Sequence, residues 1–338
     1  MSGHLIRVEF EDISFPIDEG QTVLEAAELA GWEMPYACRA GVCNSCSGRV
    51  VDGEVVVRGA VRRAGDEVLF CQARARSDLV LTPKAIRKRE SRIARRFDAT
   101  IVEKESLVQG GIIRLNLRLP IGRRLKFRPG DYIRVYIDKF EFRNYSVALG
   151  SPDNKLVELH VKVYEGGIFS QKILKMKELG EKIEIEGPYG AFDLESTLGF
   201  DLIIAVSGTG YAVVKAILSE LSKRKFLGKV WVFWAGRRDE ELYAVDELAR
   251  LGSAISGFKF IPVLSRDSSS LSGARQGHIQ DWLFDEVGSL SGKFLYLCGN
   301  QSMVESLESK WLAGGGDSSK VFCDSFVSLS QGSFAEGA

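Results

Sequence analysis

One cysteine-rich stretch decides the fold of this chain: residues 35–50 read PYACRAGVCNSCSGRV. Within it, Cys38, Cys43 and Cys46 are separated by four and two residues, and Cys71 follows after 24 more. A C-x4-C-x2-C spacing with a distant fourth cysteine is an established arrangement of thiolates around a [2Fe-2S] cluster. The glycines and small residues of the stretch suit a loop whose backbone N–H groups point at cluster sulfurs. The sequence therefore predicts an iron–sulfur site with these four cysteines as metal ligands.

A structural zinc site is the alternative, because four thiolates also form a closed tetrahedral zinc centre. Zinc sites favour two C-x2-C pairs, whereas this chain has one such pair and Cys71 stands alone after the strand-like run 68–70. The spacing therefore favours iron, and a zinc-stabilised interaction domain would give a colourless protein.

Composition limits the class of protein. With 338 residues, two or three domains are expected. The 45 basic residues are balanced by 45 acidic ones, so the basic excess typical of a nucleic-acid binder is missing. We see no secretion signal and no run of eighteen apolar residues, and expect a cytoplasmic protein without nucleic-acid or membrane partners. In that compartment the cysteines are expected to be ligands or reactive thiols rather than disulfides.

Residues 1–83 are predicted to form a first, acidic domain. Alternating runs at 5–10 and 13–17 indicate two strands of a hairpin, and a helix is expected over 23–30. Thr22 with Glu25 three residues later has the form of a capping box. The segment carries five more acidic than basic residues, so a basic partner is expected.

Residues 84–96 are predicted to be an interdomain linker, since seven of the thirteen are basic. Two interpretations stay open. The linker is either a solvated charged connector or a docking strip for an acidic surface, on the first domain or on a partner.

Two further domains are expected. Residues 97–196 contain strand-like runs between glycine and proline turns, which predicts an antiparallel β-barrel. From residue 197 to 338, continuous apolar runs alternate with helix-like segments, which predicts an α/β domain with a buried parallel sheet. The apolar runs are 202–206, 230–235, 258–264 and 294–298.

The stretch from Pro35 to Val50 closely resembles the cluster loop of plant-type ferredoxins. The resemblance covers the whole first domain and implies an α+β fold of the β-grasp type around a [2Fe-2S] cluster. The gap between Cys46 and Cys71 is shorter than in chloroplast ferredoxins.

The second domain resembles the flavin domain of the ferredoxin-NADP reductase superfamily. The residues that carry the resemblance are Arg143, Tyr145 and Ser146, followed by Gly166, Gly167 and Ser170. Arginine suits a diphosphate, and glycines that open a helix leave amides to accept phosphate oxygens. By the family's pattern, Tyr145 packs along the isoalloxazine of FAD and Ser146 hydrogen-bonds near its reactive N5.

The third domain resembles the nicotinamide-nucleotide domain of the same reductases. Ser207 to Gly210 (SGTG) follows a buried strand, but it fails as a Rossmann fingerprint, because Val213 stands at the third glycine. It resembles the family's Gly-Gly-Thr-Gly element, with Ser207 replacing the first glycine. The resemblance implies that the coenzyme binds at this loop and near a cysteine that ends a later strand. The residues are Gly208, Thr209, Gly210, Cys298 and Gly299, with Phe326 suspected near the flavin from the aromatic C-terminal ending.

The choice of coenzyme is left open. Arg237 and Arg238 would accept a 2′-phosphate, but the acidic run 239–241 beside them opposes it, so NADH is favoured and NADPH stays possible. His4, His160 and His278 are interpreted as structural.

The three modules in this order resemble reductase components of bacterial multicomponent oxygenases. The resemblance implies an NAD(P)H-dependent oxidoreductase with FAD and a [2Fe-2S] cluster, in which Ser146 and Cys298 lie at the site of hydride transfer. The acceptor would be a ferredoxin or a terminal oxygenase component, above all of an aromatic-ring-hydroxylating dioxygenase. The alternatives are the reductase of a diiron monooxygenase or of a deoxysugar dehydratase system. A redox-responsive regulatory protein is the rival from another class.

Overall fold

The structure is a computed structural model that describes residues 3–36, 39, 41, 44–88, 94–109, 111–139, 141–150, 155–176, 179–266 and 270–326. The chain divides into two compact units. The first comprises residues 1–89, 299–308 and 323–338, and the second comprises 90–298 and 309–322. The domain boundaries expected at 83, 96 and 196 stay predictions.

The first unit contains a small α+β fold built around a mixed sheet. The strand order is β2-β1-β9-β4-β7, in which β1 pairs antiparallel with β2 and parallel with β9. The predicted hairpin and helix are confirmed, and the capping box between Thr22 and Glu25 is present at the start of the helix. The elements are β1 (His4–Val8), β2 (Ser14–Ile17), α1 (Val23–Leu29), β4 (Ser47–Asp52), β7 (Glu67–Leu69) and β9 (Leu79–Pro83).

Two smaller sheets complete this part of the chain. One has the order β6-β5-β8 and the other pairs β10 with β3. Strand β10 (Arg87–Lys88) lies inside the segment predicted as a linker, and Arg87 Nε is 2.9 Å from a carboxylate oxygen of Glu33. The basic segment thus begins with a strand bound to an acidic residue of the first domain. The strands are β3 (Trp32–Glu33), β5 (Val55–Val57), β6 (Ala60–Arg62) and β8 (Ala73–Ala75).

The second unit contains the predicted barrel, which is closed and has the strand order β11-β12-β15-β14-β13-β16. Its interior is filled by buried aliphatic side chains that alternate along each strand, such as Leu115, Ile133 and Leu159. Helix α2 follows β15. The elements are β11 (Arg95–Val108), β12 (Ile112–Arg118), β13 (Tyr132–Tyr136), β14 (Phe142–Gly150), β15 (Leu156–Lys162), α2 (Ile168–Lys175) and β16 (Lys182–Tyr189).

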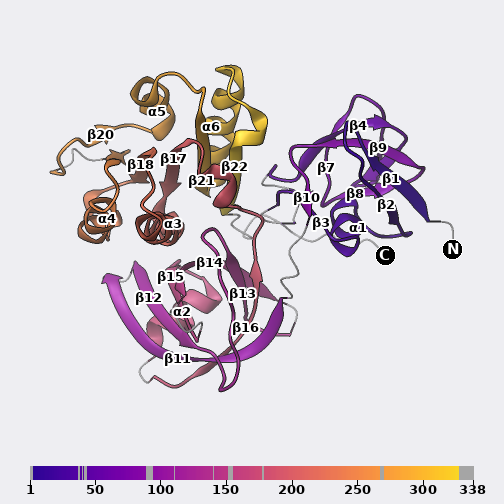
Figure 1. Cartoon of the computed structure of the whole chain (residues 1–338). Coiled ribbons are helices and arrows are strands. Elements are labelled where there is room, and N and C mark those ends of the chain that lie inside the picture. The colour runs from indigo at the N-terminus through magenta and orange to yellow at the C-terminus, as the bar shows by residue number, and fades with distance from the viewer. Residues whose placement is uncertain are drawn as a thin grey trace. The chain divides into compact units, whose positions relative to one another are not determined.

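The predicted α/β domain is confirmed as a sheet with the order β20-β19-β18-β17-β21-β22, whose strands β17, β18, β19 and β21 pair in parallel. Figure 1 shows α3 and α4 on one face of this sheet and α5 on the other. Strands covered on both faces explain the continuous apolar runs. The strands are β17 (Asp201–Ser207), β18 (Lys229–Gly236), β19 (Gly257–Leu264), β20 (Arg275–Gln276), β21 (Lys293–Asn300) and β22 (Val321–Phe326). The helices are α3 (Tyr211–Lys223), α4 (Val245–Gly252), α5 (Ile279–Val287) and α6 (Gln301–Ala313), with 3-10 turns η1 (Glu195–Thr197), η2 (Gly208–Gly210), η3 (Asp239–Glu241) and η4 (Ser318–Lys320).

Among the residues that the structure describes, no helix combines the length and the apolar character needed to cross a membrane.

Candidate functional site

The described part of the cysteine loop, residues 39, 41 and 44–46, has the backbone of a series of tight turns, and we call it the cradle. Arg39, Gly41 and Asn44 all have φ between 55° and 73°, the left-handed region. The Gln72 side-chain amide donates to the Arg39 carbonyl over 3.2 Å, and an Arg58 guanidinium nitrogen donates to the Gly41 carbonyl over 2.9 Å. The first bond joins the loop to the turn between β7 and β8 that carries Cys71, and the second joins it to the residue after β5.

Two of the four predicted ligands lie in or next to this cradle. Cys46 is 2% and Cys71 is 6% exposed, and the Phe70 amide donates to the Cys46 carbonyl over 2.9 Å. A Cβ at Gly41 would lie 2.6 Å from Gln72 Cγ, so the loop has no room for a larger residue there. Cys38 and Cys43 lie outside the described residues. The buried thiols and the glycine cradle fit a cluster that accepts backbone N–H bonds.

On the flavin side, Tyr145 and Ser146 are neighbours on β14 and therefore point to opposite faces of the strand. Ser146 is buried and pairs in register with Tyr132, whereas the Tyr145 ring packs 5.4 Å from the Phe169 ring. Burial raises the pKa of the Tyr145 phenol, so this side chain stays neutral. The pair offers a flat aromatic surface and a neighbouring hydroxyl.

The remaining predicted flavin residues lie near the ends of their elements. Arg143 forms an ion pair with Glu141 and donates to the Phe142 carbonyl over 3.0 Å. Gly166 has φ of 75°, and Gly167 is the N-cap of α2, so no side chain covers the first amides of this helix. Ser170 Oγ lies 3.3 Å from the Gly167 carbonyl oxygen. Helix amides opened by glycine fit a diphosphate.

On the nicotinamide side, the predicted loop forms η2 between β17 and α3. Gly208 has φ of 54°, and a Cβ at Gly210 would lie 2.9 Å from the Cys298 carbonyl oxygen. Val206 pairs with Cys298, so the loop and the cysteine lie at the carboxyl ends of adjacent parallel strands. Ligands of open parallel sheets bind at this edge.

The other predicted coenzyme residues differ in accessibility. The Cys298 side chain is fully buried, and Gly299 has φ of 141°. Phe326 is the last residue of β22, and its side chain lies outside what the structure describes. Thr209 is part of η2 beside Gly208.

Arg237, one of the two arginines considered for a 2′-phosphate, is bound to an acidic neighbour. Its Nε lies 2.7 Å from Glu241 Oε1, and its backbone amide donates to Glu241 Oε2 over 2.8 Å. Glu241 is therefore the residue of the run 239–241 that opposes a phosphate at Arg237 most directly.

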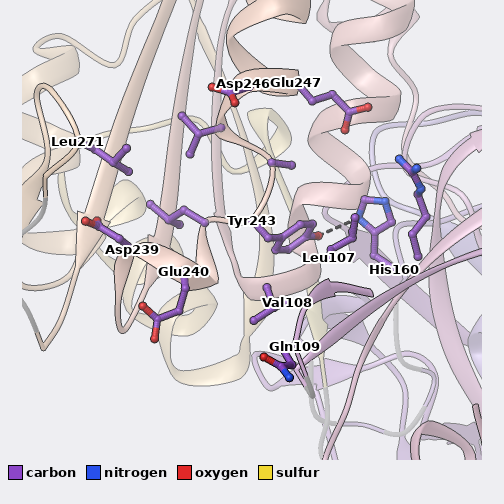
Figure 2. A pocket seen from close by; sticks show the side chains of 14 residues that line it. Leu107, Val108, Gln109, His160, Asp239, Glu240, Tyr243, Asp246, Glu247 and Leu271 are labelled. Carbon is purple, nitrogen blue, oxygen red and sulfur yellow. Dashed lines mark hydrogen bonds between the residues drawn. The ribbon is translucent and has the colours of Figure 1, made fainter. Parts of the chain in front are cut away.

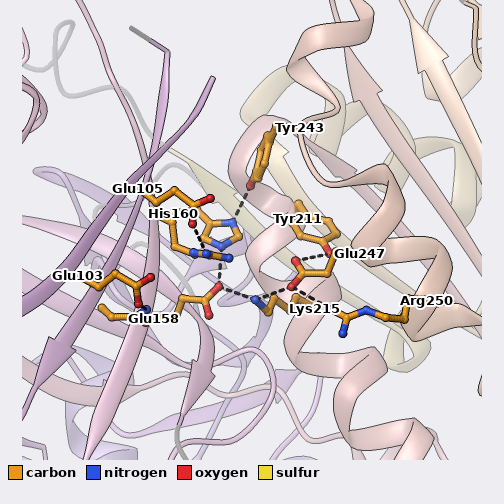
Figure 3. Close-up of polar contacts among 11 residues, drawn as sticks. Glu103, Glu105, Glu158, His160, Tyr211, Lys215, Tyr243, Glu247 and Arg250 are labelled. Carbon is orange, nitrogen blue, oxygen red and sulfur yellow. Dashed lines mark hydrogen bonds and ion pairs between the residues drawn. The ribbon is translucent and has the colours of Figure 1, made fainter. Parts of the chain in front are cut away.

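A buried charged network was not predicted from the sequence (Figure 3). Glu158 Oε1 on β15 lies 2.9 Å from His160 Nε2 and 2.7 Å from Lys215 Nζ on α3. Lys215 Nζ is also 2.8 Å from Glu247 Oε1. Burial alone would raise the pKa of Glu158, but the hydrogen bond and charge of His160 and the ammonium of Lys215 outweigh it and hold this pKa at about 2. The structural role expected for His160 thus has defined partners.

The network borders a cavity of about 950 Å³ in the second unit (Figure 2). His160 and Tyr243 face one another in its lining, with 2.8 Å between His160 Nδ1 and the Tyr243 hydroxyl oxygen. Acidic side chains dominate the charged part of the lining, which consists of Arg114, His160, Asp239, Glu240, Asp246 and Glu247.

Family models match all three predicted modules. A 2Fe-2S iron–sulfur cluster binding domain matches residues 6–76, an oxidoreductase FAD-binding domain matches 98–194, and an oxidoreductase NAD-binding domain matches 204–309. The predicted cofactors [2Fe-2S], FAD and a nicotinamide nucleotide are thereby confirmed, and zinc in place of iron is not supported.

The similarity to known proteins extends over nearly the whole chain. The chain is 32% identical to reductase component 2 of terephthalate 1,2-dioxygenase from Comamonas sp., over 90% of this chain and 92% of that protein. It is 28% identical to the reductase component of phenol 2-monooxygenase from Pseudomonas sp. (strain CF600), over 94% and 92%. The crystal structure of the Amycolatopsis cytochrome P450 reductase GcoB matches with a TM-score of 0.72 and 26% identity, over 97% of this chain and 100% of that one. The chain therefore belongs to the family of oxygenase reductase components in which a 2Fe-2S cluster-binding domain precedes oxidoreductase FAD- and NAD-binding domains.

Proposed function

We propose that this NAD(P)H-dependent oxidoreductase supplies electrons to a ferredoxin or a terminal Rieske component of an aromatic-ring-hydroxylating dioxygenase. The observation that carries the proposal is the 32% identity, over 90% of the chain, to a reductase component of terephthalate 1,2-dioxygenase. When bound, FAD takes up a hydride from the nicotinamide and the [2Fe-2S] cluster releases electrons one at a time.

The chain's own residues bind and orient these groups. We assign Cys38, Cys43, Cys46 and Cys71 to the cluster, which the buried thiols of Cys46 and Cys71 support. Tyr145 provides an apolar surface that excludes water, and the Ser146 hydroxyl donates or accepts a hydrogen bond at the flavin. The amides that Gly166 and Gly167 leave uncovered, with Arg143 and Ser170, bind the FAD diphosphate.

For the coenzyme, we assign Gly208, Thr209 and Gly210 to the diphosphate, and Cys298, Gly299 and Phe326 to the nicotinamide end. The support is topological. Cys298 lies near the carboxyl end of β21, and the 207–210 loop follows the carboxyl end of the adjacent parallel strand β17. We further propose a cytoplasmic location and no nucleic-acid partner, consistent with 45 basic and 45 acidic residues.

Redox potentials favour this direction of transfer. Plant-type clusters lie near about −400 mV and Rieske centres between about −150 and +300 mV, so transfer to a Rieske protein is downhill. The first 83 residues carry five more acidic than basic residues, which favours docking on a basic acceptor.

The test is reconstitution of the purified protein with candidate acceptors at several ionic strengths. We expect NADH-dependent product formation with a Rieske dioxygenase system, and a rate that falls as salt rises. A rate indifferent to salt would remove electrostatic docking. Turnover with a diiron hydroxylase, but with no Rieske acceptor, would favour the monooxygenase alternative, to which the similarity to the phenol 2-monooxygenase reductase component points.

A further inference from the structure

Trp234 connects the interior of the nicotinamide domain to the 207–210 loop, which we call the coenzyme loop because we assign it to the coenzyme diphosphate. Its ring is fully buried on β18, and its indole Nε1 donates to the Gly208 carbonyl oxygen over 3.0 Å. Gly208 has φ of 54°, so its peptide group is held in a conformation that few other residues adopt. The Tyr211 backbone N–H also donates to this carbonyl, so one main-chain and one side-chain hydrogen bond together fix its orientation.

The orientation of the carbonyl determines the orientation of the next amide. In a trans peptide the C=O and the following N–H point in opposite directions within one plane. Because the Gly208 carbonyl points at Trp234, the Thr209 N–H points away from the protein interior. The Thr209 amide thus lies in η2, just before α3, and an outward amide at such a position can donate a hydrogen bond to a diphosphate oxygen.

Aromatic contacts fix the Trp234 ring in turn. Tyr211 stacks on it with ring centroids 4.6 Å apart and 15° between the planes, and Tyr243 meets it edge-on at 5.2 Å. The His160 ring stacks against Tyr211 in turn, with 5.9 Å between the ring centroids. His160 lies on β15 of the barrel, so the stack runs from the flavin barrel to the coenzyme loop.

Charged contacts hold the barrel end of this stack. Glu158 binds His160 and Lys215, and the Tyr211 hydroxyl donates to Glu247 Oε2 over 2.9 Å (Figure 3). All of these side chains belong to the second unit and are buried or half-buried. The stack therefore cannot shift without separating buried charges, which is costly.

We infer that Trp234 is a positioning residue for coenzyme binding: it orients the Thr209 amide toward the diphosphate, and the stack of Tyr211 and His160 on Glu158 holds it in place against the flavin barrel. This inference rests on the proposed function, because it takes the 207–210 loop as the diphosphate site. It adds residues outside every motif that indicated that site.

The test compares Trp234→Phe with Trp231→Phe in the FAD-loaded protein. Phenylalanine keeps an aromatic ring but cannot donate to Gly208. One hydrogen bond of ordinary strength corresponds to about a three- to tenfold change in affinity. We expect the Kd of NAD+ and of ADP-ribose, measured by calorimetry, to rise by that factor in Trp234→Phe. ADP-ribose carries the diphosphate but no nicotinamide, so an equal effect on both ligands locates the loss at the diphosphate.

Kinetics provide a second readout. Because the diphosphate contact is made equally before and during hydride transfer, KM for NADH should rise while kcat changes by less than about twofold. Trp231→Phe, three residues earlier on β18, should change neither constant. A Kd unchanged in Trp234→Phe, or raised equally in Trp231→Phe, overturns the inference.

Glu158→Gln covers the case in which Trp234→Phe does not fold. It weakens the anchor of His160 while keeping the shape of the side chain, and we expect a smaller rise in the Kd of ADP-ribose, about twofold. An unchanged Kd in this variant contradicts the inference as well. Failure of the wild-type protein to bind NAD+ or ADP-ribose would instead contradict the proposed function.

Discussion

Lys215 Nζ on α3 lies 2.7 Å from Glu158 Oε1 on β15, and the two side chains are only 8% and 10% exposed. The same ammonium group is 2.8 Å from Glu247 Oε1. One buried cation therefore compensates two carboxylates, and it joins α3, the helix after the 207–210 loop, to strand β15 of the barrel. We therefore expect a substitution of Lys215 to lower the stability of the protein more than a substitution of any other member of the network.

Lys215→Met should destabilise the protein strongly. The substitution preserves much of the side chain's volume but leaves Glu158 and Glu247 without their shared cation, and breaking a buried pair in this way costs about 3–5 kcal/mol. The measurement is the free energy of unfolding by urea, followed by tryptophan fluorescence. Lys223→Met is the matched control on the same helix, because Lys223 is 69% exposed and its pair with Glu220 spans 3.4 Å. A loss as small as the control's, below about 0.5 kcal/mol, would contradict the role of Lys215.

The stability of the protein should depend on pH through Glu158. Its pKa is lowered from 4.5 to about 2 in the folded chain, so its contribution is present above pH 4.5 and is lost as pH falls toward 2. Between pH 7 and pH 3 this loss amounts to about 2 kcal/mol. Glu158→Gln cannot titrate, so the difference in unfolding free energy between the wild type and this variant should shrink by that amount. A difference independent of pH would show that Glu158 is not held ionised.

The sequence allowed the three modules and most of their strands to be predicted, because their signals are local. Cysteine spacing, the capping box at Thr22 and continuous apolar runs each lie within a few consecutive residues. Strand β14 was not predicted, since Arg143, Asn144 and Ser146 interrupt the apolar residues of Phe142–Gly150.

The charged network could not be predicted for a different reason. Glu158 and His160 alternate on β15, which in a barrel indicates an outer face open to solvent. Only the fold covers that face with α3, which brings Lys215 to it from 57 residues away. Pairing over such distances in sequence leaves no local pattern. The ion pair between Glu241 and Arg237 lies within five residues. The sequence alone shows that acidic and basic residues are neighbours there, but not which of them pair.

Gly41→Ala should impair cluster retention. An alanine Cβ there would lie 2.6 Å from Gln72 Cγ and 2.8 Å from an Arg58 guanidinium nitrogen, the two side chains that hold the loop. We expect a lower iron content per chain in the purified variant. Gly59→Ala is the control, because Gly59 has a similar φ of 81° and nothing within 4 Å of an added Cβ. Iron contents equal in the two variants would show that backbone strain alone, rather than the contacts of the cradle, decides the outcome.

Glu241→Gln should increase the use of NADPH relative to NADH. The variant releases the Arg237 guanidinium, which then offers a charged hydrogen bond to a 2′-phosphate, worth about tenfold in the ratio of kcat/KM values. Steady-state reduction of a dye with each coenzyme measures this ratio. Glu240→Gln removes an equal charge from the neighbouring residue and should change the ratio by less than about twofold. An additional Arg237→Gln substitution should reverse the gain; if the gain persists, Arg237 is not its source.

The central claim is that one chain takes electrons from a nicotinamide nucleotide and releases them singly through a four-cysteine iron–sulfur centre. Anaerobic addition of NADH to the purified protein, followed by absorption and electron paramagnetic resonance, tests it most directly. We expect the flavin and iron–sulfur bands to bleach together and a reduced-cluster signal to appear. Cys46→Ser should lose that signal and the transfer to one-electron acceptors, yet keep dye reduction by NADH. Wild-type protein without iron, or equal loss of both activities in Cys46→Ser, would contradict the account.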